Sequence, residues 1–367
     1  MKTVEYADQE IDGKELAFII SSMIIGIGVL TLPRLVATHT KGLDGLVSIL
    51  SSGGFFLFFG WLLAKSISKF PKKSFFEFTS DMMTKPVALG LTSILALAFL
   101  FTCSLETRVI ANISKLYMFD QTPIEAIALT FLLVVIYCVS GSRVALLRLN
   151  LMFLPIVLTV TLVVQFSNIS LFQLSNIQPF FTTSLNGYWQ GAQETIFSFV
   201  GYTIILVYIS LLKSPKDAPR MTMVGIGIPI LLYLVIYVIT IGVFGNLDTS
   251  EIIYPTIEIA KEIEAPGGFI ERFESIFFTV WIMTVFNTCS MAFDISIHLL
   301  HSITKLKRKT IILILSPLIY YVAVTPENAY QIQLLGKILA GIGFFYGVIF
   351  PVLFFCLTKI RKVIQHA

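Results

Sequence analysis

Two glycines one residue apart, Gly26 and Gly28, interrupt the apolar stretch LAFIISSMIIGIGVLTLPRL at 16–35. As a helix, this stretch is long enough to cross a hydrocarbon core of roughly 30 Å. Each glycine costs a helix interior on the order of 1 kcal/mol relative to alanine, so the pair favours a local break. A membrane tolerates the unpaired N–H and C=O groups of a break only where protein or a water-lined cavity covers them. The pattern therefore indicates either a discontinuous helix that builds a binding site or a glycine pair used for close helix packing.

A second apolar stretch, at 188–212, also contains a glycine near its centre. The residues at this centre are Ser198, Phe199, Val200, Gly201 and Tyr202. Counting apolar runs gives about ten spans, so this stretch is the sixth and opens a second group of five. An odd number of spans per half turns the second half upside down relative to the first. Matching interruptions in the first helix of each half are typical of a transporter binding site, so they favour broken helices.

Two broken helices would offer both donors and acceptors in the middle of a membrane. The half-helix after Gly28 would direct free N–H groups and the positive end of its dipole toward a carboxylate. Carbonyl groups released near Phe199 would accept hydrogen bonds from an ammonium, so the backbone alone suits a zwitterionic amino acid. Hydroxyls of the first span would either join the site or serve helix packing. The expected contacts in the first span are Ser21, Ser22, Gly26, Ile27, Gly28 and Val29.

A ligand side chain held at the breaks would face the third, sixth and eighth spans. Thr102, Cys103 and Glu106 share one helical face of the third span. Asn287 and Thr288 lie at a comparable depth in the eighth span. Such a lining favours a small or apolar amino acid, although each residue taken singly is more often an ordinary core residue.

Charged side chains inside apolar spans are costly, so each is a candidate for function. Glu106 lies deep in the third span, Arg34 at the outer end of the first, and Lys337 about ten residues into the tenth. We expect Glu106 to pair with Arg34 or Lys337 in an outer gate, or else to form a fixed structural ion pair. Asp294, near the inner end of the eighth span, is interpreted as a residue of a water-filled cavity or a loop pair.

The composition is that of a polytopic membrane protein. Of the 367 residues, 56% are hydrophobic and 13% are charged, with a mean hydropathy of +0.86, which excludes an ordinary soluble domain. The four cysteines have no C-x-x-C spacing and the four histidines form no cluster, so we expect neither a metal nor a cofactor. The sequence contains no phosphate-binding loop, H-E-x-x-H motif or nucleophile elbow, so we expect no enzyme. The net charge of +4 comes from connections and indicates no nucleic-acid partner.

The spans and their connections predict a topology. We expect spans at 16–37, 44–68, 87–116, 123–141, 145–166, 188–212, 221–245, 269–300, 308–325 and 330–358. With the N-terminus in the cytoplasm, the outer connections carry only Lys41 and Lys261, whereas the inner ones carry the other lysines and arginines of the connections. The positive-inside rule therefore predicts that both termini are cytoplasmic. A short surface helix is expected at 255–263, closed by Pro266 and Gly267.

A 5+5 inverted repeat with breaks in spans one and six resembles the LeuT-type fold of the amino acid–polyamine–organocation superfamily. The run Gly26-Ile27-Gly28-Val29-Leu30 is similar to the motif that those permeases carry in their first helix. The longer block ELAFIISSMIIGIGVLTLPR, at 15–34, precedes a lysine-flanked second span in a chain of about 365 residues. In these features the whole chain resembles the spore germination permease family.

That resemblance implies the B subunit of a spore nutrient-germinant receptor. It implies an all-α integral membrane protein of about ten transmembrane helices, folded as one domain, 1–367, with repeats at 1–166 and 188–360. It also implies a small amino acid as the ligand, a larger membrane A subunit and a lipoprotein C subunit as partners, and the spore inner membrane as the location. Two alternatives stay open: an ion-coupled amino-acid permease that uses the same site, and a scaffold whose site no longer binds a ligand.

Overall fold

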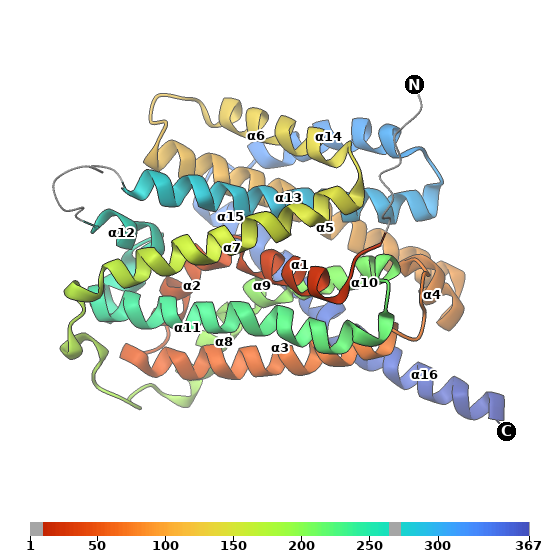
Figure 1. The fold of residues 1–367 in the computed structure, drawn as a ribbon, viewed down its shortest axis with the longest axis horizontal. Helices are drawn as coiled ribbons and strands as arrows, with labels where there is room; N and C mark the ends of the chain where they lie inside the picture. Colours follow the sequence, from red (N-terminus) through yellow and green to blue (C-terminus); the bar gives the residue numbers. More distant parts are fainter. Residues whose placement is uncertain (1–9, 264–272, 367) are drawn as a thin grey trace.

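The computed structural model describes residues 10–263 and 273–366. In these residues the chain forms a bundle of helices that run side by side along the longest axis of the molecule (Figure 1). Helix α1 (Gly13–Ile25) begins, and helix α16 (Phe350–His366) ends, at the same end of this bundle, which we call the α1 end (Figure 1). Six of the described helices are long and apolar enough to cross a membrane, and two bent helix pairs raise that number to eight.

The first five spans alternate in direction along the bundle. After α1 their elements are α2 (Gly28–Ala37), η1 (Gly42–Asp44), α3 (Gly45–Ile67), α4 (Phe75–Met82), α5 (Lys85–Tyr117), α6 (Ile124–Val139) and α7 (Arg143–Ser167). Helix α4 is not among the elements expected from the sequence, although a capping box begins it. The Ser74 hydroxyl accepts the Glu77 N–H, and the Glu77 carboxylate accepts the Ser74 N–H.

The second five spans follow two short turns, η2 (Ile169–Leu171) and η3 (Leu174–Ile177). Their elements are α8 (Leu185–Glu194), α9 (Ile196–Phe199), η4 (Val200–Ile204), α10 (Ile205–Tyr208), η5 (Ile209–Leu211), η6 (Pro215–Asp217), α11 (Ala218–Glu251), α12 (Pro255–Lys261), α13 (Phe273–Thr304), α14 (Arg308–Val324), α15 (Ala329–Phe344), the π-helical η8 (Phe345–Ile349) and α16. Helix α12 is the expected surface helix, two residues shorter. Its expected closing residues Pro266 and Gly267, and the start of the expected span at 269–300, lie outside the described residues.

The first and sixth spans are both interrupted, as predicted, although the bend of the sixth span falls at Thr195, before the predicted centre at 198–202. Helices α1 and α2 meet at a bend of 53°, and α8 meets the segment 196–211 at 41°. Gly26, at the end of α1, has φ 14° and ψ −121°, which is not a helical conformation. In the sixth span the helix narrows to the 3-10 segment η4, which contains Gly201. The tenth span also departs from a regular helix, because the π-helical η8 interrupts a stretch that we expected to be continuous.

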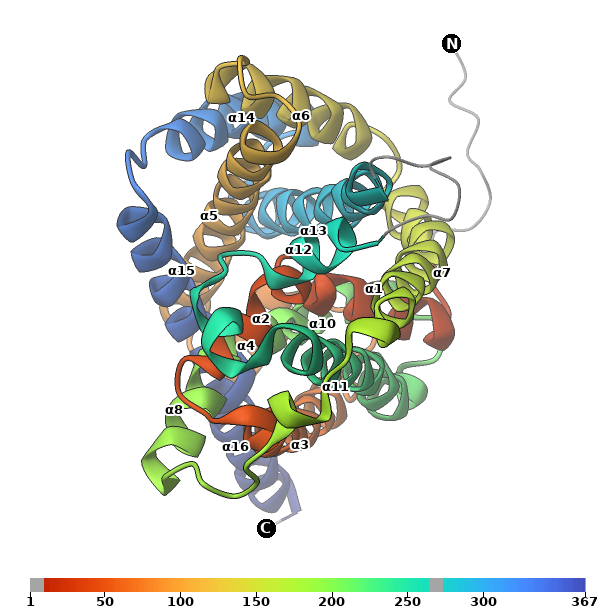
Figure 2. The same ribbon diagram turned by 90° about the vertical axis from the view of Figure 1, so that its left-hand side faces the viewer.

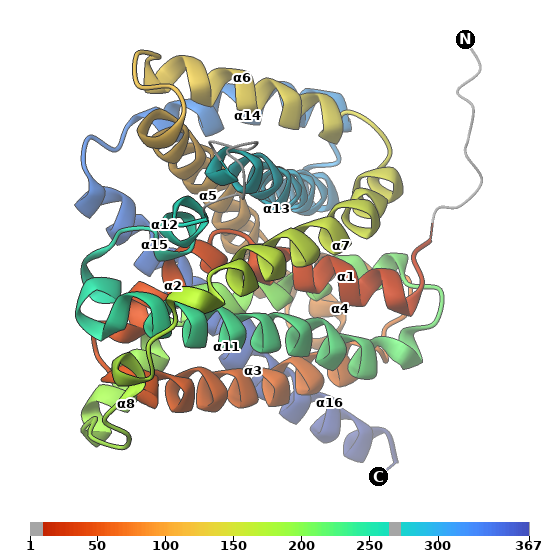
Figure 3. The ribbon, with the colours of Figure 1, turned by 60° about the vertical axis from the view of Figure 1, so that its left-hand side comes forward.

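The interrupted spans occupy the centre of the bundle. A view along the helices shows α1, α2 and α10 in the middle, with α6 and α14 at one margin and α3 and α16 at the opposite margin (Figure 2). The same order is visible after a smaller rotation (Figure 3). Large apolar side chains on peripheral helices are exposed, among them Tyr137, Leu231 and Leu313. Such a surface suits lipid rather than water, and the arrangement confirms the predicted all-α membrane fold with broken helices one and six.

Candidate ligand-binding site at the two helix breaks

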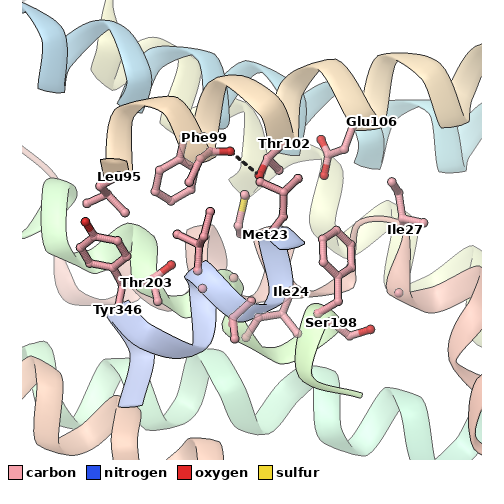
Figure 4. Close-up of a pocket in the computed structure, with 18 residues that line it drawn as sticks. Met23, Ile24, Ile27, Leu95, Phe99, Thr102, Glu106, Ser198, Thr203 and Tyr346 are labelled. Carbon is pink, nitrogen blue, oxygen red and sulfur yellow. Dashed lines mark hydrogen bonds between the residues drawn. The ribbon is translucent and has the colours of Figure 1, made fainter. Parts of the chain in front are cut away.

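A cavity of about 70 Å³ lies between the two breaks, α5 and the tenth span. One water molecule requires about 10–15 Å³ on the same measure, so the space suits a molecule of a few heavy atoms. Figure 4 shows the side chains around it. The lining residues are Met23, Ile24, Ile27, Gly28, Leu95, Ala98, Phe99, Thr102, Glu106, Phe197, Ser198, Val200, Gly201, Thr203, Leu339, Ile342, Gly343 and Tyr346.

The glycines of the two breaks allow close approach of the central segments. A Cβ atom built on Gly28 would lie 2.6 Å from both the Ser198 Oγ and the Tyr233 Oη atoms. A Cβ atom on Gly201 would lie 2.9 Å from the carbonyl oxygen of Met23. These are distances that real Cβ atoms do not adopt, so both positions require glycine in this packing. The two interpretations of the glycine pair therefore hold together, because Gly28 is needed for close packing while Gly26 has the non-helical conformation of the break.

Side chains of neighbouring helices pair the carbonyl groups that the first break releases. The Tyr233 hydroxyl donates to the Ile24 carbonyl at 2.6 Å, and the Trp281 indole N–H donates to the Gly26 carbonyl at 3.2 Å. Both side chains are buried. Because unpaired backbone groups are costly in a membrane, Tyr233 of α11 and Trp281 of α13 stabilise the break.

Glu106 is the acidic side chain among the lining residues of this cavity. Its side chain is only 5% exposed, and its Oε2 atom accepts a hydrogen bond of 2.7 Å from the Thr288 hydroxyl of α13. A Cβ atom on Gly26 would lie 3.8 Å from Oε1 of the same carboxylate. The carboxylate thus lies beside the first break and is oriented by the eighth span.

Two thiols lie directly behind this carboxylate. The Cys103 and Cys289 sulfur atoms are 2.9 Å apart and fully buried, and Thr107 Oγ1 is 3.6 Å from the Cys289 sulfur. Cys103 therefore contacts α13 and is not among the residues that line the cavity. The two thiols mark the close packing of α5 against α13.

Seven of the sixteen predicted ligand contacts line the cavity. They are Ile27, Gly28, Thr102, Glu106, Ser198, Val200 and Gly201. The other predicted contacts are buried around the cavity and have partners of their own or pack in the core. They are Ser21, Ser22, Gly26, Val29, Cys103, Phe199, Tyr202, Asn287 and Thr288. Their role in ligand contact stays a prediction, as does that of the seven.

The contacts of these surrounding residues show how they support the breaks. Ser21 donates to the Gly225 carbonyl of α11 at 2.9 Å, and Tyr202 donates to the Gly347 carbonyl of η8 at 2.6 Å. The Val29 carbonyl accepts the Thr256 hydroxyl of α12 at 2.7 Å. Each bond connects a broken span to a different neighbouring helix.

The expected gate residues lie apart from one another in this structure. The Arg34 Nε atom donates to the Ser250 carbonyl at 3.4 Å, and Lys337 is exposed on α15. Among the described residues, the ion pairs do not join Glu106 to either cation, and Thr288 is the hydrogen-bond partner of Glu106 instead. The pairing expected from the sequence is therefore absent in this conformation, and a gating role stays a prediction.

The tenth span and the first half of α5 supply lining residues that the sequence analysis missed. Leu95, Ala98 and Phe99 precede Thr102 and Glu106 on one face of α5, at a spacing that extends the predicted face by two turns. That spacing was a usable signal. Leu339, Ile342, Gly343 and Tyr346 come from the tenth span, and only its packing against η4 brings them to the cavity.

A cluster of charges lies between the cavity and the α1 end. Asp294 is fully buried and accepts hydrogen bonds from the Arg143 Nε atom at 3.0 Å and the Arg308 Nη2 atom at 2.7 Å. The Tyr208 hydroxyl of α10 lies within 3.3 Å of the same carboxylate. The Arg308 guanidinium also donates to the Val139 carbonyl at 2.8 Å. Asp294 therefore joins four helices and the inner half of the broken sixth span. Of the two interpretations of Asp294, the structure agrees with a residue that pairs with other charged groups rather than one that lines a water-filled cavity.

The chain is similar in sequence to known proteins. A family model described as spore germination protein matches residues 10–332. The chain is 41% identical to spore germination protein GerLB of Bacillus cereus, over 99% of this chain and 98% of the relative. It is 28% identical to spore germination protein A2 of Bacillus subtilis (strain 168), over 94% of each chain.

Solved structures share the fold at low sequence identity. MhsT in complex with L-phenylalanine superposes with a TM-score of 0.66 at 14% identity, covering 93% of this chain and 87% of MhsT. Mhp1, a nucleobase-cation-symport-1 family transporter with bromovinylhydantoin bound, gives a TM-score of 0.64 at 13% identity, covering 93% and 78%. These similarities support the LeuT-type architecture.

Proposed function

The chain belongs to the spore germination protein family, and from that membership we propose that it is the nutrient-sensing membrane subunit of a spore germination receptor. In this proposal a small amino acid binds at the centres of the broken helices one and six and triggers germination. The proposal makes the chain a binding protein and not an enzyme. Its partners are the lipid bilayer, a membrane A subunit and a lipoprotein C subunit.

The cavity between the two breaks is the observation that supports a small amino acid as the ligand. Its volume of about 70 Å³ suits a molecule of a few heavy atoms. Apolar side chains such as Phe99, Leu339 and Ile342 form most of its wall, and Glu106, Thr102 and Ser198 add polar groups. The N-terminus of α2, at Gly28, also lies at the cavity, and its free N–H groups suit a carboxylate.

Charge distribution supports the proposed orientation in the spore inner membrane. Lys65, Lys69, Arg143 and Arg308 lie on segments at the α1 end of the bundle. By the positive-inside rule, this end faces the cytoplasm, so both termini are cytoplasmic. We also propose the repeat boundaries expected from the sequence, 1–166 and 188–360.

An ion-coupled amino-acid permease is the second candidate, because the solved structures of this fold include a transporter. Receptor and permease need the same pocket and differ in whether the ligand crosses the membrane. Uptake of a labelled amino-acid panel into proteoliposomes that hold the full chain, with bound ligand counted in the same samples, distinguishes the two. Saturable binding without accumulation supports the receptor, and accumulation above the bound amount supports the permease. Absence of binding contradicts both.

Gly28→Ala provides the site-specific test, because its Cβ atom would meet Ser198 and Tyr233. We expect this variant to lose ligand binding. Gly341→Ala is the matched control, since a Cβ atom there has open space within 4 Å. Equal binding by both variants would place the ligand elsewhere.

A further inference from the structure

The cavity has an unusual charge distribution for a site that holds a zwitterion. Among the described residues that line it, Glu106 is the one carboxylate, and none is a lysine, arginine or histidine. The side chain of Glu106 is directed away from the α5 ribbon, on the side where Thr102 and Met23 lie (Figure 4). The one ionisable side chain among these lining residues is therefore an acid, and it lies beside the first break.

Two backbone acceptors of the first break already have side-chain partners. The Ile24 carbonyl accepts the Tyr233 hydroxyl, and the Gly26 carbonyl accepts the Trp281 indole N–H. A carbonyl oxygen has a second lone pair, but an oxygen that already accepts one hydrogen bond is a weaker acceptor for an incoming ammonium. The carboxyl group of Glu106 lies beside these groups. Once an ammonium compensates its negative charge it is the stronger acceptor, because hydrogen bonds to ionised acceptors are shorter and stronger.

One oxygen of the Glu106 carboxyl group lies toward the first break. Thr288 donates to Oε2 at 2.7 Å and thereby fixes the rotation of the carboxylate. Oε1 is directed to Gly26, 3.8 Å from the position of a Cβ atom there. In the part of the chain that the structure describes, the ion pairs do not include Glu106. A buried carboxylate is costly unless a cation or hydrogen-bond donors compensate it.

We propose that the carboxylate of Glu106 binds the ammonium group of the ligand, so that the site selects small neutral amino acids by their amine. This inference rests on the proposed function and adds its recognition chemistry. The ligand's carboxylate then lies at the N-terminus of α2, and its apolar part lies against Phe99 and the tenth span. A 2-hydroxy acid of the same skeleton lacks the cation and is rejected.

A free monovalent metal ion is the other source of positive charge for this carboxylate. The ammonium and the metal ion predict different effects of sodium in the buffer on amino-acid affinity. If the ammonium binds Glu106, replacing sodium with choline in the buffer leaves amino-acid affinity unchanged. If sodium occupies Glu106, the replacement weakens binding, and Glu106→Gln removes that sodium dependence.

The test is equilibrium binding to the full chain in lipid nanodiscs. Neutral L-amino acids from glycine to leucine are compared with 2-hydroxy acids of the same skeletons, such as L-alanine with L-lactate. For the wild type we expect the amino acid to bind at least about 10-fold more tightly. For Glu106→Gln we expect a loss of roughly 10- to 100-fold in amino-acid affinity, with the 2-hydroxy acid little changed. Glu327→Gln makes the same chemical change at an exposed position and serves as the control.

The outcomes separate this inference from the proposed function. Amino acids that bind wild type and Glu106→Gln equally, or a wild type that binds L-lactate as well as L-alanine, overturn the ammonium contact and leave the binding function intact. A sodium dependence that disappears in Glu106→Gln assigns the carboxylate to the metal ion and also overturns the inference. If no amino acid of the panel binds the wild type, the proposed function itself fails. If Glu106→Gln fails to fold, the inference stays testable, because a wild type that binds L-lactate as well as L-alanine still overturns it.

Discussion

Gly201 lies directly against the backbone of Met23: a Cβ atom on Gly201 would be 2.9 Å from the Met23 carbonyl oxygen and 3.1 Å from its carbonyl carbon. The glycine of the second break thus packs on the last turn of α1, just before the first break. The segments that interrupt the first and sixth spans are therefore packed against each other.

Gly201→Ala should destabilise the protein, because the new methyl group can be accommodated only by separating η4 from α1. Overpacking of this kind typically costs about 1–3 kcal/mol. Thermal unfolding of the purified protein in detergent measures the effect. In contrast, Gly227→Ala, in α11 with open space around its Cβ position, should be neutral or stabilise by up to about 1 kcal/mol. A Gly201→Ala protein as stable as Gly227→Ala would contradict the packing of the two breaks.

Asp294→Ala should be strongly destabilising, because it leaves the guanidinium groups of Arg143 and Arg308 without their shared carboxylate. Removing one partner of a buried ion pair typically costs about 3–5 kcal/mol. Tyr208→Phe removes only a hydroxyl with contacts at 3.3 Å to Asp294 and to the Met291 carbonyl, so its cost should be about 1 kcal/mol. Thermal unfolding of both variants gives the comparison, and equal losses would be inconsistent with Asp294 as the centre of the cluster.

Asp44→Ala should release the connection between the fifth and sixth spans. The buried Asp44 carboxylate accepts the backbone N–H groups of Phe181, Thr182 and Thr183 at 2.6, 2.9 and 2.8 Å. Without it, these N–H groups should exchange with solvent at least about 10-fold faster, since each loses a charge-assisted bond. Hydrogen exchange read by mass spectrometry measures this. Asp120→Ala, at an exposed position, should leave exchange at 181–183 unchanged.

The stability of α4 should depend on pH through Glu77. The hydrogen bond from the Ser74 backbone N–H lowers the pKa of the Glu77 carboxyl below its ordinary value of 4.5. A depressed folded-state pKa means that the stabilisation is fully present above the ordinary value and is lost as pH falls through the folded value. Glu77→Gln keeps a capping side chain but cannot titrate. The protection of the α4 amides, which is their exchange rate corrected for the intrinsic pH dependence of exchange, should therefore fall more steeply from pH 6 to pH 3 in the wild type than in Glu77→Gln. Parallel curves would contradict the assignment.

Local signals in the sequence were enough to predict the interrupted spans. The cost of Gly26 and Gly28 in a helix is a property of the residues themselves, so it could be recognised without a structure. The alternation of apolar runs and basic connections likewise predicted about ten spans, of which six to eight are long and apolar enough among the described helices to cross a membrane. Helix α4 carried a readable capping signal in Ser74 and Glu77, but its eight residues are too few to show a clear apolar period.

The lining of the cavity was harder to predict, because it depends on which faces of distant helices meet. Nothing near Ile342 or Tyr346 in the sequence indicates that the tenth span contacts η4, and the π-helical turn there arises in the packed structure. The partner of Glu106 depended on the same information. A charge in a span suggests another charge as its partner, yet the structure provides the Thr288 hydroxyl of a helix 182 positions away.

The π-helical η8 connects the cavity to a distant part of the molecule. The Tyr202 hydroxyl of the sixth-span break is bound to its Gly347 carbonyl, and η8 continues without interruption into the 17 residues of α16. A rod of that length extends about 25 Å at 1.5 Å per residue. If Tyr202 moves when a ligand arrives, a tilt of about 5° at η8 displaces the last turn of α16 by about 2 Å. The tenth span is therefore placed to carry a movement at the cavity to the end of α16, which extends outside the bundle (Figure 1).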